Sequence, residues 1–146
     1  MIYNKSWWKW SLGIWMSLVI VGAFIYAPAA KGLGETARIL FFHVPTAWLA
    51  TLAFLISAIN SIQYLRKQDI KFDIWASSAA QIGIIFAALA TVTGSIWAKK
   101  IWQSYWNWDP RETSIFILLL IYAAYFALRS AIDVEEQKAK LSAVYS

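Results

Sequence analysis

The chain contains no cysteine and little charge. Of its 146 residues, 14% are Asp, Glu, Lys or Arg, whereas 60% are hydrophobic. Without cysteine, the chain forms neither disulfide bonds nor thiolate metal sites. A water-soluble domain is about a quarter charged, because water must solvate its surface. The scarcity of charge therefore excludes an ordinary soluble domain and predicts an integral membrane protein.

The few charges are clustered, and they leave four long apolar stretches. Crossing the hydrocarbon layer takes about 20 apolar residues at ~1.5 Å of helix rise each. We therefore expect one all-α integral membrane domain over residues 1–146. Its parts are about four transmembrane helices at 11–27, 39–65, 74–97 and 113–129, a tryptophan-rich loop at 97–112, and a charged cytoplasmic tail at 130–146.

The first and last stretches each need a comment. A cleaved signal peptide is the competing interpretation of the first, but its length and its bulky Trp15 and Met16 favour a retained helix. The fourth stretch is short. We expect it to gain length from a first turn at Pro110 and from Arg129 snorkelling outward. The tail that follows is expected to be a helical extension or a frayed end.

Lysine and arginine concentrate on the cytoplasmic side of membrane proteins, so their distribution predicts the orientation. If the stretches alternate across the membrane, the side of the two termini has eight basic residues and the other side has five. The eight are Lys5, Lys9, Arg66, Lys67, Lys71, Arg129, Lys138 and Lys140, and the five are Lys31, Arg38, Lys99, Lys100 and Arg111. We therefore expect both termini in the cytoplasm and the tryptophan-rich loop on the outer (periplasmic) face. Membrane orientation also explains the net charge of +5 without nucleic acid as a partner.

The loop at 97–112 concentrates aromatic residues, namely Trp97, Trp102, Tyr105, Trp106 and Trp108. One interpretation is an aromatic belt, because indole rings favour the level of the lipid headgroups. A belt spreads over many helix ends, however, and the other outer loop, at 28–38, has no aromatic residue. The second interpretation is a binding site for a flat apolar ligand, since large rings offer stacking area at little entropic cost. Composition alone leaves both open.

The carboxylates of Asp109 and Glu112 flank Pro110 at the end of this loop. Asp as N-cap, Pro at the first helical position and Glu at the third are typical of a helix start. This pattern favours a capping role over a catalytic pair. No pair of nucleophile and base is visible nearby, so we expect the protein not to be an enzyme.

His43 is the only histidine, and it lies about one turn into the second apolar stretch. An ionisable residue in a membrane segment is costly unless it is paired or functional. Its imidazole either hydrogen-bonds a neighbouring helix or serves as an axial ligand of haem iron, and spacing alone favours neither. The predicted orientation puts His43 at the same membrane surface as the tryptophan-rich loop, which favours the ligand.

Four cations are expected on that surface: Arg38, Lys99, Lys100 and Arg111. They are either ordinary flanking charges or partners for the carboxylates of an amphipathic ligand. Haem suits this set of residues, because it combines a flat apolar ring, an iron that binds nitrogen, and two propionates.

Two segments resemble a known family. Residues 97–113, with their Trp-Asn-Trp-Asp-Pro-Arg-Glu-Thr core, are similar to the tryptophan-rich WWD signature of the haem-handling proteins of cytochrome c maturation. The run at 92–97 resembles the segment that leads into it, and residues 38–48, with Phe42-His43-Val44-Pro45, resemble the family's first histidine segment. The resemblance covers residues 35 to about 130. It is strongest to the haem exporter protein C (CcmC) branch, and CcsA-type cytochrome c synthases share the loop.

The resemblance implies a role for each segment. The loop would hold transiently bound haem b at the outer face of the inner membrane, with His43 as an axial ligand and Arg38, Lys99, Lys100 and Arg111 as candidates for the propionates. The platform would consist of Trp97, Trp102, Tyr105, Trp106, Trp108 and Asp109. In the CcmC branch, haem passes to a membrane-anchored haem chaperone, and an ATP-binding-cassette (ABC) transporter partner releases the loaded chaperone. Covalent haem attachment of the CcsA type is the one enzymatic exception.

The sequence departs from the family pattern in two places. CcmC-like proteins usually have six transmembrane helices and a second ligating histidine, whereas this sequence stops after the fourth stretch and has only His43. Tyr105 also stands where the family often has tryptophan, which keeps an aromatic face. A truncated product, half of a split protein, and a short form that borrows a ligand from a dimer mate or another partner all stay open as explanations.

A structural role is the alternative function. The third apolar stretch has small residues at spacings of three and four, namely Ala76, Ala79, Ala80, Gly83, Ala87, Ala90 and Gly94. Such a stripe lets another helix approach closely in lipid. A transmembrane subunit that anchors a larger membrane complex would need this stripe and no haem site.

Overall fold

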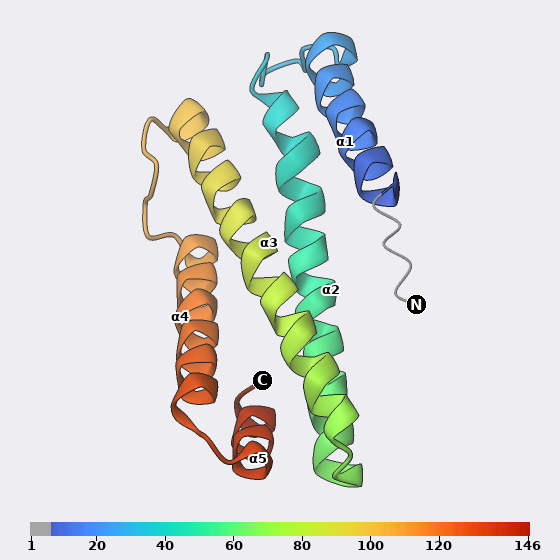
Figure 1. Cartoon of the computed structure of the whole chain (residues 1–146). Helices are drawn as coiled ribbons and strands as arrows, with labels where there is room; N and C mark the ends of the chain where they lie inside the picture. Colours follow the sequence, from blue (N-terminus) through green and yellow to red (C-terminus); the bar gives the residue numbers. More distant parts are fainter. Residues whose placement is uncertain (1–6) are drawn as a thin grey trace. The chain divides into compact units, whose positions relative to one another are not determined.

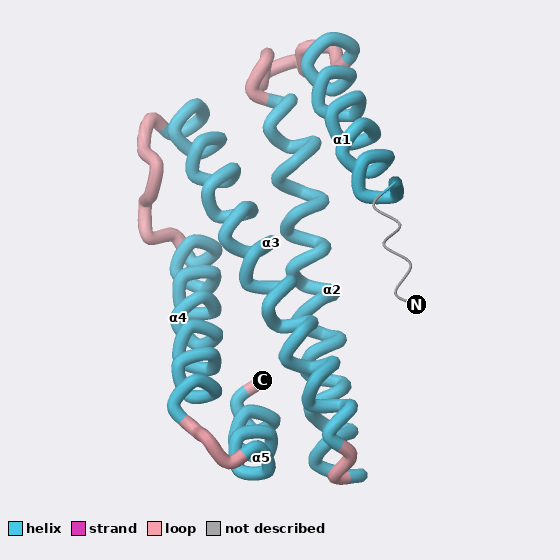
Figure 2. Tube along the Cα trace, viewed as in Figure 1, coloured by secondary structure: helices cyan, strands magenta, loops and turns pink. Residues whose placement is uncertain are grey.

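The computed structural model describes residues 7–146, which form five helices joined by short loops (Figure 1). The helices are α1 (Trp7–Tyr26), α2 (Ala37–Lys67), α3 (Ile70–Trp102), α4 (Pro110–Ala131) and α5 (Glu135–Tyr145). Over residues 7–146 there is no strand beyond an isolated bridge between Ala30 and Gly34 (Figure 2). The predicted all-α class is therefore confirmed. Lys5, used in the orientation count, lies outside the described residues.

Helices α1 to α4 are each long and apolar enough to cross a membrane. The 31 residues of α2 and the 33 residues of α3 reach about 45–50 Å, well beyond the roughly 30 Å hydrocarbon layer. Their large apolar side chains face outward: Trp48, Leu55 and Ile85 are each more than half exposed. Lipid would solvate such side chains as well as a protein core does. The predicted multi-pass membrane protein with about four spanning helices is confirmed.

The helices extend past the predicted spans at every end but one, and this shortens the tryptophan-rich loop. A loop is predicted above from Trp97, whereas α3 continues to Trp102 and α4 begins at Pro110. The prediction is wrong for residues 97–102, because Lys99 and Lys100 lie in the last turns of α3, where the helix dipole favours positive charge. Helix ends are not membrane boundaries, so the four spans themselves stay predictions.

The chain forms two compact units, residues 1–41 and residues 42–146. In the described part of the first unit, α1 buries none of its residues. A turn with Gly32 and Gly34 at positive φ leads from α1 toward α2. The side chain of Arg38 donates to the carbonyl oxygen of Ala27 at 3.1 and 3.2 Å and also pairs with Glu35. Arg38 is therefore engaged within its own unit.

In the second unit, α2 and α3 pack closely because α3 presents small residues to α2. Ala80 and Ala87 are fully buried, and Gly83 is buried as well. A Cβ atom on Gly83 would lie 2.6 Å from Cε1 of Phe54, so only glycine lets the helices approach this far. Further along, the Ser57 hydroxyl donates to the carbonyl oxygen of Ala76 at 2.9 Å. The small-residue stripe thus serves packing inside the chain.

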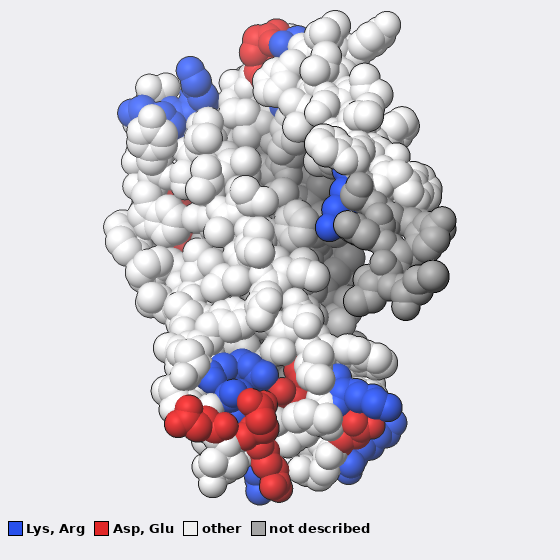
Figure 3. Space-filling model, viewed as in Figure 1, with Lys and Arg blue, Asp and Glu red and all other residues white. Residues whose placement is uncertain are grey.

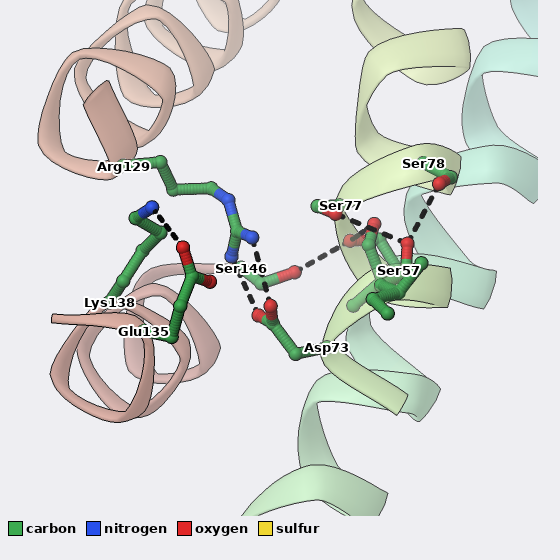
Figure 4. A network of polar contacts seen from close by, with 10 residues as sticks. Ser57, Asp73, Ser77, Ser78, Arg129, Glu135, Lys138 and Ser146 are labelled. Atoms are coloured by element: carbon green, nitrogen blue, oxygen red, sulfur yellow. Dashed lines mark hydrogen bonds and ion pairs between the residues drawn. The ribbon is translucent and has the colours of Figure 1, made fainter. Parts of the chain in front are cut away.

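An ion pair joins α3 to α4 at the end of the unit away from the tryptophan-rich loop. The guanidinium of Arg129 donates to both carboxylate oxygens of Asp73, at 2.6 and 2.9 Å (Figure 4). Arg129 is expected above to snorkel outward, and that expectation is wrong. Its side chain is 16% exposed, because the buried carboxylate of Asp73 offers a bidentate partner.

The tail forms a helix of its own, α5, separated from α4 by an extended segment at 132–134. Ala139 and Ala143 pack against Tyr64 of α2. Within this unit, blue and red side chains gather around α5 and the turn between α2 and α3, a blue group lies over the end of α3 at the upper left, and the face between them is almost entirely white (Figure 3). Charged ends beside an apolar face fit a membrane-embedded unit.

Candidate functional site

A hollow of about 270 Å³ opens among α2, α3 and the start of α4. Ligand sites in proteins usually measure roughly 300–1,000 Å³, so this one is small. Its lining is contributed by three segments of the second unit: His43 and Ala47 of α2; Ala90, Thr91, Gly94, Ser95, Trp97, Ala98 and Trp102 of α3; and Trp106, Asp109, Arg111, Glu112 and Ile115 of the loop and α4. It combines one imidazole, three indoles and an arginine on an apolar floor.

The imidazole of His43 is held by α3 through one of its two nitrogens. Nδ1 lies 3.0 Å from the carbonyl oxygen of Ala90 and 3.3 Å from Oγ1 of Thr93. A carbonyl oxygen can only accept, so Nδ1 carries the proton. The Thr93 hydroxyl donates its own hydrogen to the carbonyl oxygen of Leu89 at 2.8 Å, which leaves Oγ1 free to accept from His43. Nδ1 is therefore the ring nitrogen that joins His43 to α3.

Nε2 is the nitrogen left for the hollow. Among residues 7–146 no partner bonds to it, whereas His43 itself belongs to the lining. A neutral imidazole whose other nitrogen donates to a backbone carbonyl is the usual form of a metal-ligating histidine. The structure thus confirms that His43 bonds a neighbouring helix through Nδ1, and its role as a haem ligand stays a prediction.

The indoles of the site pack edge to face. The rings of Trp97 and Trp102 meet at 90° with their centroids 5.2 Å apart, and those of Trp106 and Trp108 meet at 86° and 5.7 Å. In the described part of the chain, the Nε1 atoms of Trp97 and Trp106 are buried and have no hydrogen-bond partner. A buried donor without a partner costs about 1–3 kcal/mol, so these two N–H groups are unsatisfied in residues that line the hollow.

The carboxylate of Asp109 caps α4, which confirms its predicted capping role, whereas that of Glu112 holds the preceding loop. Asp109 accepts from the backbone N–H groups of Arg111 at 2.8 Å and Glu112 at 2.9 Å, and Pro110 is the first helical residue. Glu112 reaches back to the N–H of Asn107 at 2.5 Å. The side chain of Arg111 donates to Asp109 and, with the N–H of Glu112, lowers the pKa of the Asp109 carboxyl below its ordinary value. Both carboxylates have structural partners.

The hollow collects some of the predicted site residues and omits others. His43, Trp97, Trp102, Trp106, Asp109 and Arg111 all line it. Tyr105 and Trp108 do not; they are 59% and 65% exposed. The ammonium of Lys99 lies over the ring of Tyr105 and donates to the carbonyl oxygen of Gln103. Lys100 is exposed, and Arg38 belongs to the other unit. Their roles toward a ligand stay predictions.

Ala90, Thr93 and Gly94 surround His43, although the sequence does not reveal that contact. Ala90 and Gly94 belong to the small-residue stripe, which indicates helix packing in general and no particular partner. The signal that could have found them is their helical register. Residues 90, 94 and 97 lie on one face of α3, so the face that packs against α2 leads into Trp97 of the hollow.

The chain is similar to haem exporters over its whole described length. A family model described as Heme exporter protein C (CcmC) matches residues 2–146. Heme exporter protein C of Bradyrhizobium diazoefficiens is 36% identical over 137 residues, covering 92% of this chain and 52% of that relative. The protein of the same name from Escherichia coli K12 is 34% identical, covering 77% and 46%. A ccmC-like mitochondrial protein of cytochrome c biosynthesis from Marchantia polymorpha is 35% identical, covering 80% and 48%. The chain spans about half the length of the curated relatives it matches.

Proposed function

The chain belongs to the haem exporter protein C (CcmC) family, and from that premise we propose that it binds haem transiently and delivers it for the assembly of c-type cytochromes. The observation that carries the proposal is the pairing of a free imidazole nitrogen with a tryptophan-lined hollow. His43 lines the hollow with its Nδ1 already engaged by Ala90, and Trp97, Trp102 and Trp106 line the same hollow. Haem supplies what such a site takes: an iron that binds nitrogen and a flat ring that stacks on aromatic faces.

The buried indole donors support this ligand over a purely apolar one. Trp97 and Trp106 each hold an N–H group with no partner among the described residues. A hydrocarbon would leave both groups unsatisfied, whereas carboxylate oxygens would accept from them. Haem b carries two propionates, and the site thus has donors for an amphipathic molecule with a flat apolar body.

Arg111 is the cation that we propose for the propionates. It lines the hollow, its guanidinium lies 5.1 Å from the ring centre of Trp102, and it donates to Asp109 at 2.7 Å. Asp109 accepts from one terminal nitrogen of Arg111, which leaves other N–H groups of the fork for a ligand. Lys99, Lys100 and Arg38 are further candidates, which we rank below Arg111 because none of them lines the hollow.

We further propose a location and partners for this activity. Haem would be bound at the outer face of the inner membrane, with both termini of the chain in the cytoplasm. The receiving partner would be a membrane-anchored haem chaperone, assisted by ABC-transporter-like membrane proteins. A second histidine ligand would come from outside these 146 residues, because His43 is their only histidine. The four apolar helices support contact with membrane lipid.

Two other functions have less support. The small-residue stripe favours a structural subunit only if it faces a partner, whereas Gly83 packs against Phe54 and Gly94 packs against His43 within this chain. An enzyme needs free catalytic groups, whereas Asp109 caps α4 and Glu112 accepts from the backbone N–H of Asn107. We therefore propose haem delivery without covalent chemistry, and a CcsA-type lyase as the enzymatic alternative.

Purification from haem-replete cells tests the proposed function. The expected result is a Soret band in the detergent-purified protein that weakens in His43→Ala and in Trp106→Ala. Trp15→Ala is the matched control, because Trp15 lies in α1 and is 65% exposed; the band should keep its intensity. Wild-type protein that carries no haem, or a band equally intense in all three variants, would contradict the proposal. Haem attached covalently to an apocytochrome by this protein alone would favour the lyase.

A further inference from the structure

The contacts around His43 are more specific than helix packing requires. Three consecutive groups on one face of α3 meet its ring: the carbonyl oxygen of Ala90, Oγ1 of Thr93, and the bare Cα of Gly94. Thr93 and Gly94 lie three and four residues after Ala90, so each neighbours Ala90 on the surface of α3. The first two accept from the same ring nitrogen, Nδ1. The third determines how near the ring approaches the helix.

Gly94 is the sterically critical member of the three. A Cβ atom built on it would lie 2.9 Å from Cε1 of His43, 3.3 Å from Nδ1 and 3.7 Å from Nε2. Its φ is not positive, so the backbone conformation does not demand glycine there. The demand comes from the imidazole, which occupies the space of the missing side chain. Any side chain at this position would push the ring away from the Ala90 carbonyl.

We propose that Thr93 and Gly94 are positioning residues that, with the carbonyl oxygen of Ala90, form a seat for His43, which holds the ring with Nδ1 donating to α3 and leaves Nε2 for the hollow. The two acceptors determine the tautomer, and Gly94 determines the depth and angle of the ring. This inference rests on the proposed function only for what Nε2 binds; the seat itself is a property of the chain without a ligand.

The seat matters for delivery because it is built from neutral acceptors. A carboxylate that accepts from Nδ1–H would raise the basicity of the opposite nitrogen strongly. A backbone carbonyl and a hydroxyl polarise the ring less. Within residues 7–146, no Asp or Glu forms a hydrogen bond or an ion pair with His43. Such a ligand orients an iron while binding it only moderately, which suits a carrier that must release its cargo.

The tautomer can be measured without haem. Because His43 is the only histidine, labelling with ¹⁵N-histidine reports on this ring alone. The protein is purified with an affinity tag that contains no histidine. NMR of the full chain in detergent at neutral to mildly alkaline pH should show a protonated Nδ1 and an unprotonated Nε2. Thr93→Ser keeps an acceptor and should preserve the Nδ1–H resonance, whereas Thr93→Val removes one of the two acceptors and should shift that resonance while the Ala90 carbonyl keeps the proton on Nδ1. A wild-type ring protonated at Nε2 would overturn the seat.

Haem titration tests what the seat does for binding. Outer-shell partners of metal-ligating histidines change affinity by about 10–100-fold. We expect haem affinity to fall about 10-fold or more in Gly94→Ala and several-fold in Thr93→Val, with recovery in Thr93→Ser. Gly83→Ala is the matched control, because its Cβ meets Phe54 at 2.6 Å, a tighter clash than at Gly94 but remote from the ring. Affinity is expressed per folded protein, so a loss of fold in either glycine variant does not count as a loss of binding.

The outcomes separate the inference from the proposed function. If Gly94→Ala and Gly83→Ala bind haem alike while His43→Ala does not bind, the seat is wrong and the function stands. If wild-type protein fails to bind haem but shows the Nδ1-protonated tautomer, and Thr93→Val shifts its Nδ1–H resonance, the seat stands and the function is wrong. Chemical rescue adds a check. In His43→Gly, added imidazole should restore haem binding better than 1-methylimidazole does. When 1-methylimidazole binds iron through its free nitrogen, the methylated nitrogen takes the place of Nδ1 and has no hydrogen to donate to Ala90. Equal rescue would contradict the seat.

Discussion

The ion pair between Asp73 and Arg129 gives a sharp test of how α3 and α4 are held together. Asp73 is 3% exposed, and both of its oxygens accept from the guanidinium. Asp73→Asn would leave Arg129 buried without its counter-charge, which costs about 3–5 kcal/mol. Asp73 also lies in the first turn of α3, where the helix dipole favours a negative charge by about 0.3–1 kcal/mol. We therefore expect the free energy of unfolding to fall by about 3–6 kcal/mol.

Denaturant unfolding in detergent micelles, followed by tryptophan fluorescence, measures this loss. Replacing both residues by leucine should cost much less than Asp73→Asn, because an apolar pair leaves no buried charge behind. Glu135→Gln is the control: it breaks the pair of Glu135 with Lys138, in which the Glu135 side chain is 72% exposed, and should hardly change stability. A loss below about 1 kcal/mol for Asp73→Asn, the scale of a surface pair, would refute the reasoning.

Three further predictions concern packing, capping and the indole donors. Gly83→Ala should lower the free energy of unfolding by about 1–3 kcal/mol through overpacking against Phe54, measured by the same denaturation. The pKa of Asp109 is lowered in the folded protein, so its ionised form stabilises the start of α4 above the ordinary carboxyl pKa. That contribution disappears as pH falls through the lowered pKa. The melting temperature of Asp109→Asn should therefore depend less on acid pH than that of wild type does. The same pH dependence in both proteins would contradict the cap. Trp106→Phe keeps a ring but removes a buried N–H, so titration should show haem affinity reduced about 10-fold, whereas Trp108→Phe, at an exposed indole, should bind nearly as wild type does.

The helices could be predicted because lipid imposes a simple rule on the sequence. Each apolar stretch had to be long enough to cross the membrane, and each became one helix. The start of α4 was also readable, since Asp109 and Pro110 act within one turn of each other. The end of α3 was not. The C-cap of α3 is Gln103, which has a φ of 61° although glycine is the usual residue in that conformation. Lys99 and Lys100 also suggested a loop, because two adjacent charges are typical of one.

Contacts between distant residues account for what the sequence did not reveal. Asp73 and Arg129 are 56 positions apart, and each alone resembles a charge that flanks a membrane helix. For the same reason the sequence placed His43 at the surface of the tryptophan-rich loop but could not identify Thr93, 50 positions away, as its partner. Local patterns report on turns and faces, whereas such pairs depend on how helices are rotated against one another. The hollow itself, with His43 beside Trp97 and Trp106, is the part of the site that topology could anticipate.

Titration of haem into the purified, haem-free protein in detergent tests the central claim most directly. Saturable binding at one haem per site, with a Soret band that changes when His43→Ala is substituted, is the predicted result. Affinity should fall at least about 10-fold in that variant, as expected when an oriented metal ligand is lost, and Gly83→Ala should bind as wild type does. Haem that binds wild type and His43→Ala with equal affinity and identical spectra would show that the imidazole in the tryptophan-lined hollow is not the haem ligand.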